Sequence, residues 1–302
     1  MNQNVRHGDE ALARANGIEI AYDTFGDPHA PSLLLISGLG GQMINWDEEF
    51  CTQFALRGYR VIRFDNRDVG LSTRFDHEGI PDIAELTAAQ QLGGAVQTPY
   101  SLRDMAEDAV GLLDALEIDS THVAGSSMGG RIAQMMAIQY PERIRTLTSI
   151  MATMGEAGYP PPKPEAFEVL LTPDPTDRAG YIESTLHGAR VLGGPGFPIH
   201  EKRIRDRAGK AYDRGFHPEG VTRQLAALMA EGSSKDALKS LKIPALVIHG
   251  DDDPLIPVAC AEDIARTIPG ATLLIIEGMG HALGDNPEIW PRLVDAVARH
   301  AV

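Results

Sequence analysis

The sequence places one serine where a strand pattern meets a helix pattern with no loop between them. Residues 123–130 read Val-Ala-Gly-Ser-Ser-Met-Gly-Gly, so the serine lies in the spacing Gly125-x-Ser127-x-Gly129. Small residues two positions to either side let a strand and a helix pass each other at a sharp, strained turn. The start of a helix also favours negative charge, because its first N–H groups are free. We therefore take Ser127 as the candidate nucleophile.

A serine hydroxyl is a weak nucleophile that needs a histidine to take its proton and an acid to orient that histidine. Both follow later strand patterns: an acidic turn, 251–253, comes after residues 245–249, and His281 comes after residues 272–276. The carboxyl ends of parallel strands meet at one edge of a sheet, so these side chains can converge on Ser127. His281 also lies between glycines that allow a loop to bring it over the sheet, and it is our candidate base.

Three aspartates compete for the role of the acid. Asp251 and Asp252 directly follow Gly250 and suit solvated turn residues. Asp253 precedes Pro254, which biases it toward extended backbone and fixes the chain after it. We favour Asp253.

The elements that would position these residues alternate along the chain. Residues 10–15 and 18–25 predict an antiparallel pair of strands joined at Asn16-Gly17. Short apolar runs predict buried strands at 33–36, 59–64, 144–150, 245–249 and 272–276, and apolar periodicity predicts helices at 46–56, 101–116, 132–140, 258–268 and 286–300. Such alternation predicts an α/β fold, a mostly parallel sheet with helices on both faces.

Two stretches interrupt this alternation. Residues 74–99 have weak periodicity and predict a long loop with one short helix. From residue 155 to about residue 235, prolines punctuate short helical patterns, and the 11 acidic and 11 basic residues balance. We predict an inserted helical cap at 155–235 and an α/β core formed by 1–154 and 236–302. The basic stretch 202–210 within the cap favours a solvated helix face over an anion site.

Composition limits the partners and the location. The chain has 302 residues, a formal net charge of −15, and apolar runs that fall short of the roughly 20 residues needed to span a bilayer. We expect no nucleic acid or membrane as partner, and a cytoplasmic protein, since residues 1–15 are polar. Cys51 and Cys260 lie far apart without metal-ligand spacing and predict reduced core thiols. The oligomeric state stays open.

One rival interpretation concerns a dinucleotide. Gly38 and Gly40 follow a strand, and Asp65 ends a later one, as in a dinucleotide-binding turn. Met43, however, occupies the position of the third glycine, and two other strands precede the motif. We therefore expect neither NAD nor FAD, and no metal or other cofactor.

Three motifs give the chain a resemblance to the α/β-hydrolase family: the turn 125–129, the pair Asp253-Pro254 and the pair Gly280-His281. The segments 66–72 and 278–282 are similar to the subgroup that contains the anthracycline methylesterases, such as aclacinomycin methylesterase. The likeness covers nearly the whole chain. It implies an α/β-hydrolase fold with a cap and a catalytic triad of Ser127, Asp253 and His281.

The resemblance also implies that the backbone N–H groups of Leu39 and Met128 hold the oxyanion. Many family members carry His-Gly in the first oxyanion turn, whereas this chain has Ser37-Gly38. Because the donor is backbone, the difference bears on substrate preference more than on catalysis.

These residues predict a serine carboxylic-ester hydrolase that acts through an acyl-enzyme on small to medium uncharged esters. We expect an apolar pocket built from Trp46, Met128 and the cap. Hydrolysis of C–C bonds, opening of lactones and perhydrolysis use the same triad and remain open. A serine at position 127 disfavours dehalogenase and epoxide-hydrolase chemistry, for which the family uses an aspartate nucleophile. A non-enzymatic ligand receptor on the same fold is the other class of function, and a complete triad argues against it.

Overall fold

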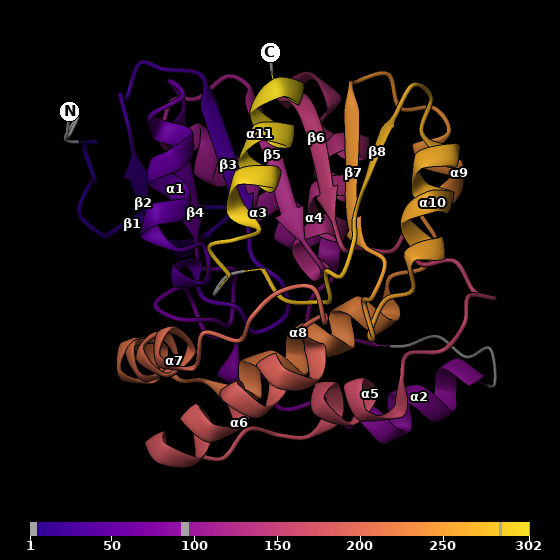
Figure 1. Ribbon diagram of the computed structural model, residues 1–302. Helices are drawn as coiled ribbons and strands as arrows, with labels where there is room; N and C mark the ends of the chain where they lie inside the picture. The colour runs from indigo at the N-terminus through magenta and orange to yellow at the C-terminus, as the bar shows by residue number, and fades with distance from the viewer. Residues whose placement is uncertain (1–4, 92–96, 284–285, 302) are drawn as a thin grey trace.

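The computed structural model describes residues 5–91, 97–283 and 286–301 and contains one eight-stranded sheet in the order β1-β2-β4-β3-β5-β6-β7-β8 (Figure 1). The strands are β1 (Ala11–Ala15), β2 (Ile18–Phe25), β3 (Ser32–Ile36), β4 (Arg60–Phe64), β5 (Thr121–Ser126), β6 (Ile144–Ile150), β7 (Ala245–Gly250) and β8 (Thr272–Ile276). β2 is antiparallel to both of its neighbours, β1 and β4, and the strands β3 to β8 are all parallel to one another. The predicted α/β sheet with an antiparallel edge is confirmed.

Helices cover both faces of the sheet and bury two separate apolar clusters. One face packs against α3 (Leu102–Ala115), α4 (Met128–Gln139) and α10 (Val258–Thr267), and the other against α1 (Glu48–Ala55) and α11 (Trp290–His300). β3 is buried at every position, because it lies in the middle of the sheet with helices on both sides. Such a two-sided core holds the strand ends rigidly, and the candidate site lies at those ends.

Four helices form a layer beyond the carboxyl ends of the parallel strands: α5 (Pro164–Leu171), α6 (Arg178–Leu192), α7 (Glu201–Gly215) and α8 (Pro218–Ala230) (Figure 1). α2 (Ile83–Gln91), which comes from the predicted loop 74–99, contacts α8. The short α9 (Lys235–Leu238) returns the chain to α4 and α10. Residues 92–96 of the predicted loop lie outside the described residues. We keep 155–235 as the proposed cap.

The first residues of α1 and α11 differ from the predicted ones, and for α1 a capping group explains the difference. α1 begins at Glu48 rather than at Trp46, since the carboxylate of Asp47 accepts a hydrogen bond from the Glu49 N–H at 2.8 Å. α11 begins at Trp290, later than predicted. The predicted cap at Ser101 is confirmed as a capping box with Asp104.

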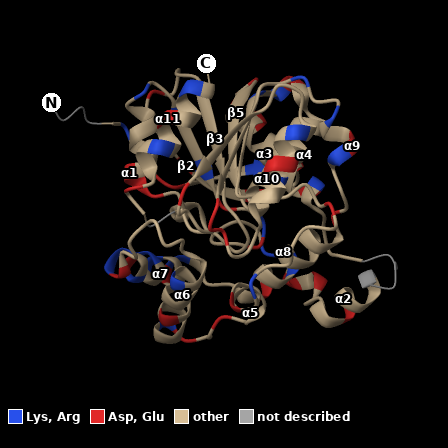
Figure 2. Cartoon of the chain, turned by 45° about the vertical axis from the view of Figure 1, so that its right-hand side comes forward, with Lys and Arg blue, Asp and Glu red and all other residues tan. Residues whose placement is uncertain are grey.

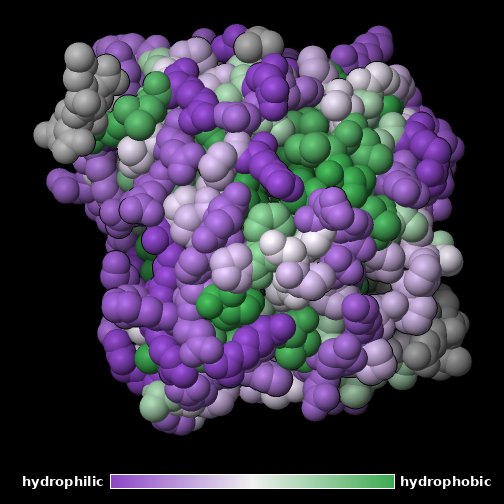
Figure 3. Space-filling model, viewed as in Figure 1, coloured by the Kyte–Doolittle hydropathy of each residue, from purple (hydrophilic) through white to green (hydrophobic). Residues whose placement is uncertain are grey.

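The surface charge and the exposed apolar groups are distributed unevenly. Basic side chains gather on α7 (Figure 2), but only some of them are simply solvated. Lys202 is exposed, as a solvated helix face requires. Arg203 instead pairs with Asp47 at 2.8 Å, and Arg207 lines a pocket between the sheet and the helical layer, so only part of this basic stretch is solvated. At the β8 edge of the sheet, where Leu273 and Ile275 are exposed, Figure 3 shows an apolar area. Within the described residues, the helices are all too short or too polar to cross a bilayer.

Candidate active site

Ser127 lies in the strained turn that its glycine neighbours predict. Its backbone has φ 55° and ψ −121°, a left-handed conformation that residues with a side chain rarely adopt. A Cβ on Gly125 would stand 2.0 Å from the Gly129 carbonyl oxygen, and one on Gly129 would stand 2.2 Å from that of Ile36. Gly125 is therefore required for β5 to pass α4, and Gly129 is required for α4 to pass the end of β3. The turn presents Ser127 above the end of β5.

The structure brings Ser127, His281 and Asp253 together from three strand ends. The Oγ atom of Ser127 lies 3.0 Å from Nε2 of His281, and Nδ1 of His281 lies 2.7 Å from Oδ2 of Asp253. Since a carboxylate only accepts, Nδ1 donates to Asp253, which leaves Nε2 of the neutral ring as the acceptor facing the serine hydroxyl. This arrangement can move a proton from Ser127 to His281.

The carboxylate of Asp253 is fully buried and held at both oxygens. Oδ1 accepts hydrogen bonds from the backbone N–H groups of Leu255 and Ile256 at 2.9 and 2.8 Å. Burial by itself raises the pKa of Asp253, but the facing His281 and the hydrogen bonds outweigh it and hold the pKa well below its usual range. Asp253 is therefore ionised at neutral pH.

The two neighbouring aspartates do not reach His281. Both are exposed, and Asp251 instead accepts a hydrogen bond from the Gly278 N–H at 2.7 Å. Asp252 contacts the same loop through its backbone N–H, which donates to the Met279 carbonyl oxygen. The two residues thus support the loop that carries His281, whereas Asp253 contacts the imidazole itself.

Sequence reasoning missed a second histidine behind the acid. His249, the penultimate residue of β7, is completely buried, and its Nε2 lies 2.8 Å from the Ile256 carbonyl oxygen and 3.3 Å from Oδ2 of Asp253. A carbonyl oxygen only accepts, so Nε2 carries a proton and also faces the carboxylate. The only signal in the sequence was a polar residue at the end of an otherwise apolar strand pattern.

The proposed oxyanion groups lie beside Ser127. A Cβ on Gly38 would stand 3.3 Å from Cβ of Ser127, so the turn after β3 contacts the serine directly. Met128 follows the serine as the first residue of α4, where the N–H groups lack partners within the helix. Among the described residues, the N–H groups of Leu39 and Met128 form no hydrogen bond with the protein. Both are therefore available to a ligand.

A pocket of about 400 Å³ contains Ser127 and His281 and lies between the sheet and the helical layer. Its walls come from the turn after β3 and from α5–α8, and include Leu39, Trp46, Val169, Leu170, Asp174, Tyr181, Leu192, Arg207 and Val221. Trp46 is among these lining residues, and its role in binding substrate stays a prediction. The prediction for the Met128 side chain is wrong: it is buried in the apolar cluster beneath the sheet end, because the turn points it inward, away from the pocket.

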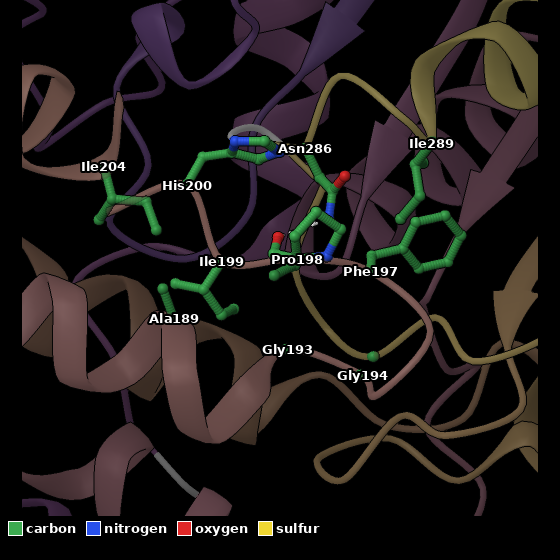
Figure 4. A pocket seen from close by; sticks show the side chains of 12 residues that line it. Ala189, Gly193, Gly194, Phe197, Pro198, Ile199, His200, Ile204, Asn286 and Ile289 are labelled. Atoms are coloured by element: carbon green, nitrogen blue, oxygen red, sulfur yellow. Dashed lines mark hydrogen bonds between the residues drawn. The ribbon is translucent and has the colours of Figure 1, made fainter. Parts of the chain in front are cut away.

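A second cavity lies between α6 and the loop after β8. Figure 4 shows its mostly apolar lining, with Phe197 on the side of Ile289 and Ile199 on the side of Ala189. Its volume is about 30 Å³, far below the 400 Å³ of the pocket beside Ser127. The pocket that contains Ser127 and His281 is the candidate substrate site.

The segment after α6 packs tightly against the loop that carries His281. The His281 N–H donates to the Leu192 carbonyl oxygen at 2.7 Å, and the Gly196 N–H donates to that of Gly278 at 2.9 Å. A Cβ on Gly194 would stand 2.1 Å from the same Gly278 oxygen, so only glycine permits the contact. The position of His281 therefore depends partly on this segment.

One cluster among the described residues has the spacing of metal ligands: Asp68, Asp76 and His217, whose ligand atoms lie within 4.8 Å of one another. The guanidinium of Arg223 is already among them, with Nη2 at 2.8 Å from Asp68, 2.9 Å from Asp76 and 2.9 Å from His217. We assign the cluster to this internal cation. That the protein needs no metal stays a prediction.

The carboxylate of Asp65, the acid of the rival dinucleotide interpretation, is already bound by other groups of the protein. It is fully buried, and it accepts hydrogen bonds from the Met43 N–H at 2.7 Å and from the Leu71 N–H at 3.0 Å. It also pairs with Arg214 of α7 at 2.6 Å. Its carboxylate is therefore not available to a ribose hydroxyl.

Comparison with known proteins places this site in a family. Residues 31–189 match the family described as the alpha/beta hydrolase fold, and residues 227–288 match the family described as TAP-like protein. The first match spans more than half of the chain. The chain belongs to the α/β-hydrolase family.

This α/β-hydrolase is similar to rhodomycin D methylesterase of Streptomyces peucetius, with 31% identity over 85% of this chain and 87% of that protein. It is also similar to 3-oxoadipate enol-lactonase 2 of Acinetobacter baylyi, with 27% identity over 94% and 95% of the two chains. A meta-cleavage product hydrolase from Pseudomonas fluorescens shares its fold, with a TM-score of 0.74, 21% identity and 96% of each chain covered. With esterases and other hydrolases as its relatives, the chain is a hydrolase.

Proposed function

We propose that this hydrolase cleaves carboxylic esters through an acyl-enzyme on Ser127. The observation that carries the proposal is the contact series from Ser127 Oγ to His281 Nε2 at 3.0 Å and from His281 Nδ1 to Asp253 at 2.7 Å. Ser127 and His281 line a pocket large enough for an organic ester. Residues 155–235 act as the cap that closes this pocket.

Acylation starts when Ser127 Oγ attacks the ester carbonyl carbon and His281 Nε2 takes the hydroxyl proton. Asp253 stays ionised and stabilises the imidazolium, because its pKa is lowered in this environment. The N–H groups of Leu39 and Met128 donate to the oxyanion. The imidazolium then gives its proton to the leaving alcohol, and a water molecule activated by His281 releases the acid and regenerates Ser127.

The pocket supports small to medium uncharged esters as substrates. Its volume of about 400 Å³ lies within the range of roughly 300–1,000 Å³ typical of small-molecule sites. A methylesterase and an enol-lactonase are among the relatives, and both names describe cleavage of an acyl–oxygen bond. Lactone opening, C–C bond hydrolysis and perhydrolysis use the same triad and are the alternatives. We also propose a cytoplasmic location, which the two free buried cysteines support.

The test is a panel of p-nitrophenyl esters of rising acyl length, run beside methyl esters, lactones and a vinylogous diketone. We expect ester turnover in the wild type and a loss of about 10⁴-fold or more in kcat for Ser127→Ala. A phosphonate should label Ser127 once per chain, as peptide mapping would show. Ester rates at background with rapid diketone cleavage would overturn the proposal, and so would a label on Ser126.

A further inference from the structure

The helical layer does more than enclose the pocket, because α8 contacts the turn that carries Leu39. Val221 and Gln224 lie one helical turn apart on α8 and therefore face the same direction. A Cβ on Gly40, which has φ 65°, would stand only 3.0 Å from a methyl carbon of Val221. The helix thus packs directly on the residue that follows Leu39.

Gln224 makes two hydrogen bonds from a fully buried position. The Gly40 N–H donates to its Oε1 at 2.9 Å, and its Nε2 donates to the Arg67 carbonyl oxygen at 2.7 Å. The backbone N–H can only donate and the carbonyl can only accept, so the two partners fix which end of the amide faces which. Gln224 therefore joins the turn after β3 to the turn after β4.

Arg223, the residue before Gln224, anchors α8 to Asp68. The guanidinium of Arg223 forms two hydrogen bonds with the carboxylate of Asp68, at 2.9 and 2.8 Å, and both side chains are buried. A paired, buried contact of this kind fixes orientation as well as position. The amide of Gln224 is held by its own two hydrogen bonds, to Gly40 and Arg67, which do not involve the Arg223 side chain.

The rest of the turn is held by other side chains. Asn66 Nδ2 donates to the Ser37 carbonyl oxygen at 3.2 Å, and Asp65 accepts from the Met43 N–H at 2.7 Å. These contacts hold the two ends of the turn, and the Gly41 N–H closes it on the Gly38 carbonyl oxygen at 3.0 Å. Among the described residues, Gln224 is the side chain bonded to the N–H immediately after Leu39.

From this placement we propose that Gln224 is a positioning residue for the oxyanion site. By holding the Gly40 N–H, it fixes the peptide unit between Leu39 and Gly40. This unit adjoins the Gly38–Leu39 unit, which carries the Leu39 N–H, and so limits the directions in which that N–H can point toward the reacting carbonyl oxygen. The inference rests on the proposed function. It makes α8 part of the catalytic arrangement, whereas a cap that only binds substrate would leave the oxyanion site unchanged.

The test compares an ester with its thionoester, in which sulfur replaces the carbonyl oxygen. Sulfur accepts hydrogen bonds poorly, so an intact oxyanion site favours the oxo ester strongly and a loosened site favours it less. In Gln224→Met, we expect kcat for the oxo ester to fall about 10- to 100-fold, less than the ~10²–10³-fold loss for removing a donor outright. KM should change little, and the oxo-to-thiono rate ratio should fall at least about fivefold.

The matched control is Arg223→Lys, which weakens the anchoring of α8 to Asp68 and leaves the amide of Gln224 in place. It should lower the melting temperature and keep the oxo-to-thiono ratio of the wild type. If Gln224→Met does not fold, Gln224→Asn decides, because its shorter side chain cannot span Gly40 and Arg67 and should also lower the ratio. Folding is checked by circular dichroism.

The outcomes separate this inference from the proposed function. A wild-type enzyme without Ser127-dependent turnover would contradict the function itself. Turnover in the wild type with an unchanged ratio in the folded Gln224 variants would overturn the role of Gln224 alone. An equal fall of the ratio in Arg223→Lys would also overturn it, since the effect would then come from general loosening of α8.

Discussion

Two regions hold their functional side chains by different means. One is the edge of the sheet at which the parallel strands have their carboxyl ends, and the other is the helical layer that lies against it. Ser127, Asp253 and His281 each follow a parallel strand, and short-range backbone features fix two of them: the strained turn at Ser127 and the backbone N–H groups that bind Asp253. The pocket walls on α5–α8 are instead held by side-chain bonds between distant segments, such as Arg214 to Asp65 and Gln224 to Gly40.

This difference separates chemistry from selectivity. The sheet edge supplies the reacting groups, and the helical layer supplies about half of the residues that line the pocket. The two regions meet at several places, among them the contact of Gln224 with the turn of Leu39 and the hydrogen bond from the His281 N–H to the Leu192 carbonyl oxygen. Substitutions at the sheet edge should therefore change the rate for every substrate. Those of pocket-lining side chains in the layer should change which substrate is preferred, whereas Gln224, which contacts the turn of Leu39, belongs with the sheet edge in this respect.

The largest expected effect lies at the sheet edge. Asp253→Asn should lower kcat by about 10⁴-fold, the loss typical of this change in the triad of a serine protease, because an amide favours the wrong imidazole tautomer. The measurement is kcat for a p-nitrophenyl ester, with folding checked by circular dichroism.

The neighbouring aspartates provide the control. Asp251→Asn keeps an oxygen that can accept from the Gly278 N–H, and Asp252 is exposed, so each change to Asn should cost at most about threefold, as expected at surface turns. If Asp253→Asn stays within about tenfold of the wild type while one of the others collapses, the acid is that other residue.

A second effect concerns the stability of the sheet. His122 of β5 is buried beside Thr146, and burial, with the charges of Arg145 and His300, lowers its pKa to about 4. The unfolded chain, with a histidine pKa of about 6.5, then takes up the proton first as the pH falls. The contribution of His122 to folding stability should be complete above about pH 6.5 and decrease by up to ~3 kcal/mol on the way down to about pH 4.

The measurement is the free energy of unfolding in urea at about pH 7.5 and about pH 5, on either side of the ordinary histidine pKa. His122→Gln, which cannot take up a proton, should lose less stability between these two pH values than the wild type does. Equal losses in both proteins would show that the acid sensitivity arises elsewhere.

The smallest effect belongs to the helical layer. Leu170 of α5 lines the pocket, and Leu170→Ala should lower kcat/KM about tenfold for esters large enough to reach α5, the cost of a few lost methyl contacts. Acetyl esters and the rate of phosphonate labelling should be unaffected. Leu171→Ala is the matched control, because Leu171 is 42% exposed and lies outside the pocket lining. A uniform loss for all esters in Leu170→Ala would contradict the separation of the two regions.

The sequence by itself predicted the parts of the site that depend on local constraints. The spacing of Gly125 and Gly129 indicated the turn at Ser127, and the limit at Gly125 is local, because a side chain there would collide with the Gly129 carbonyl oxygen. The collision that a side chain at Gly129 would make, with Ile36 of β3, is visible only in the structure. The sheet was predictable for a similar reason, since the alternation of short apolar runs and helical periods is a local property. The strands at 18–25, 144–150 and 272–276 were predicted to the residue.

Only the tertiary structure decided which distant residues meet. Gln224 lies 184 positions from Gly40 along the chain, and no period or spacing in the sequence indicates that contact. The same is true of His249 behind Asp253, and of the Met128 side chain, which points into the core while its neighbour Ser127 faces the pocket. The physical reason is that packing between segments depends on how the helical layer sits on the sheet. Strain and periodicity are set within a few residues, whereas that docking is set by the whole fold.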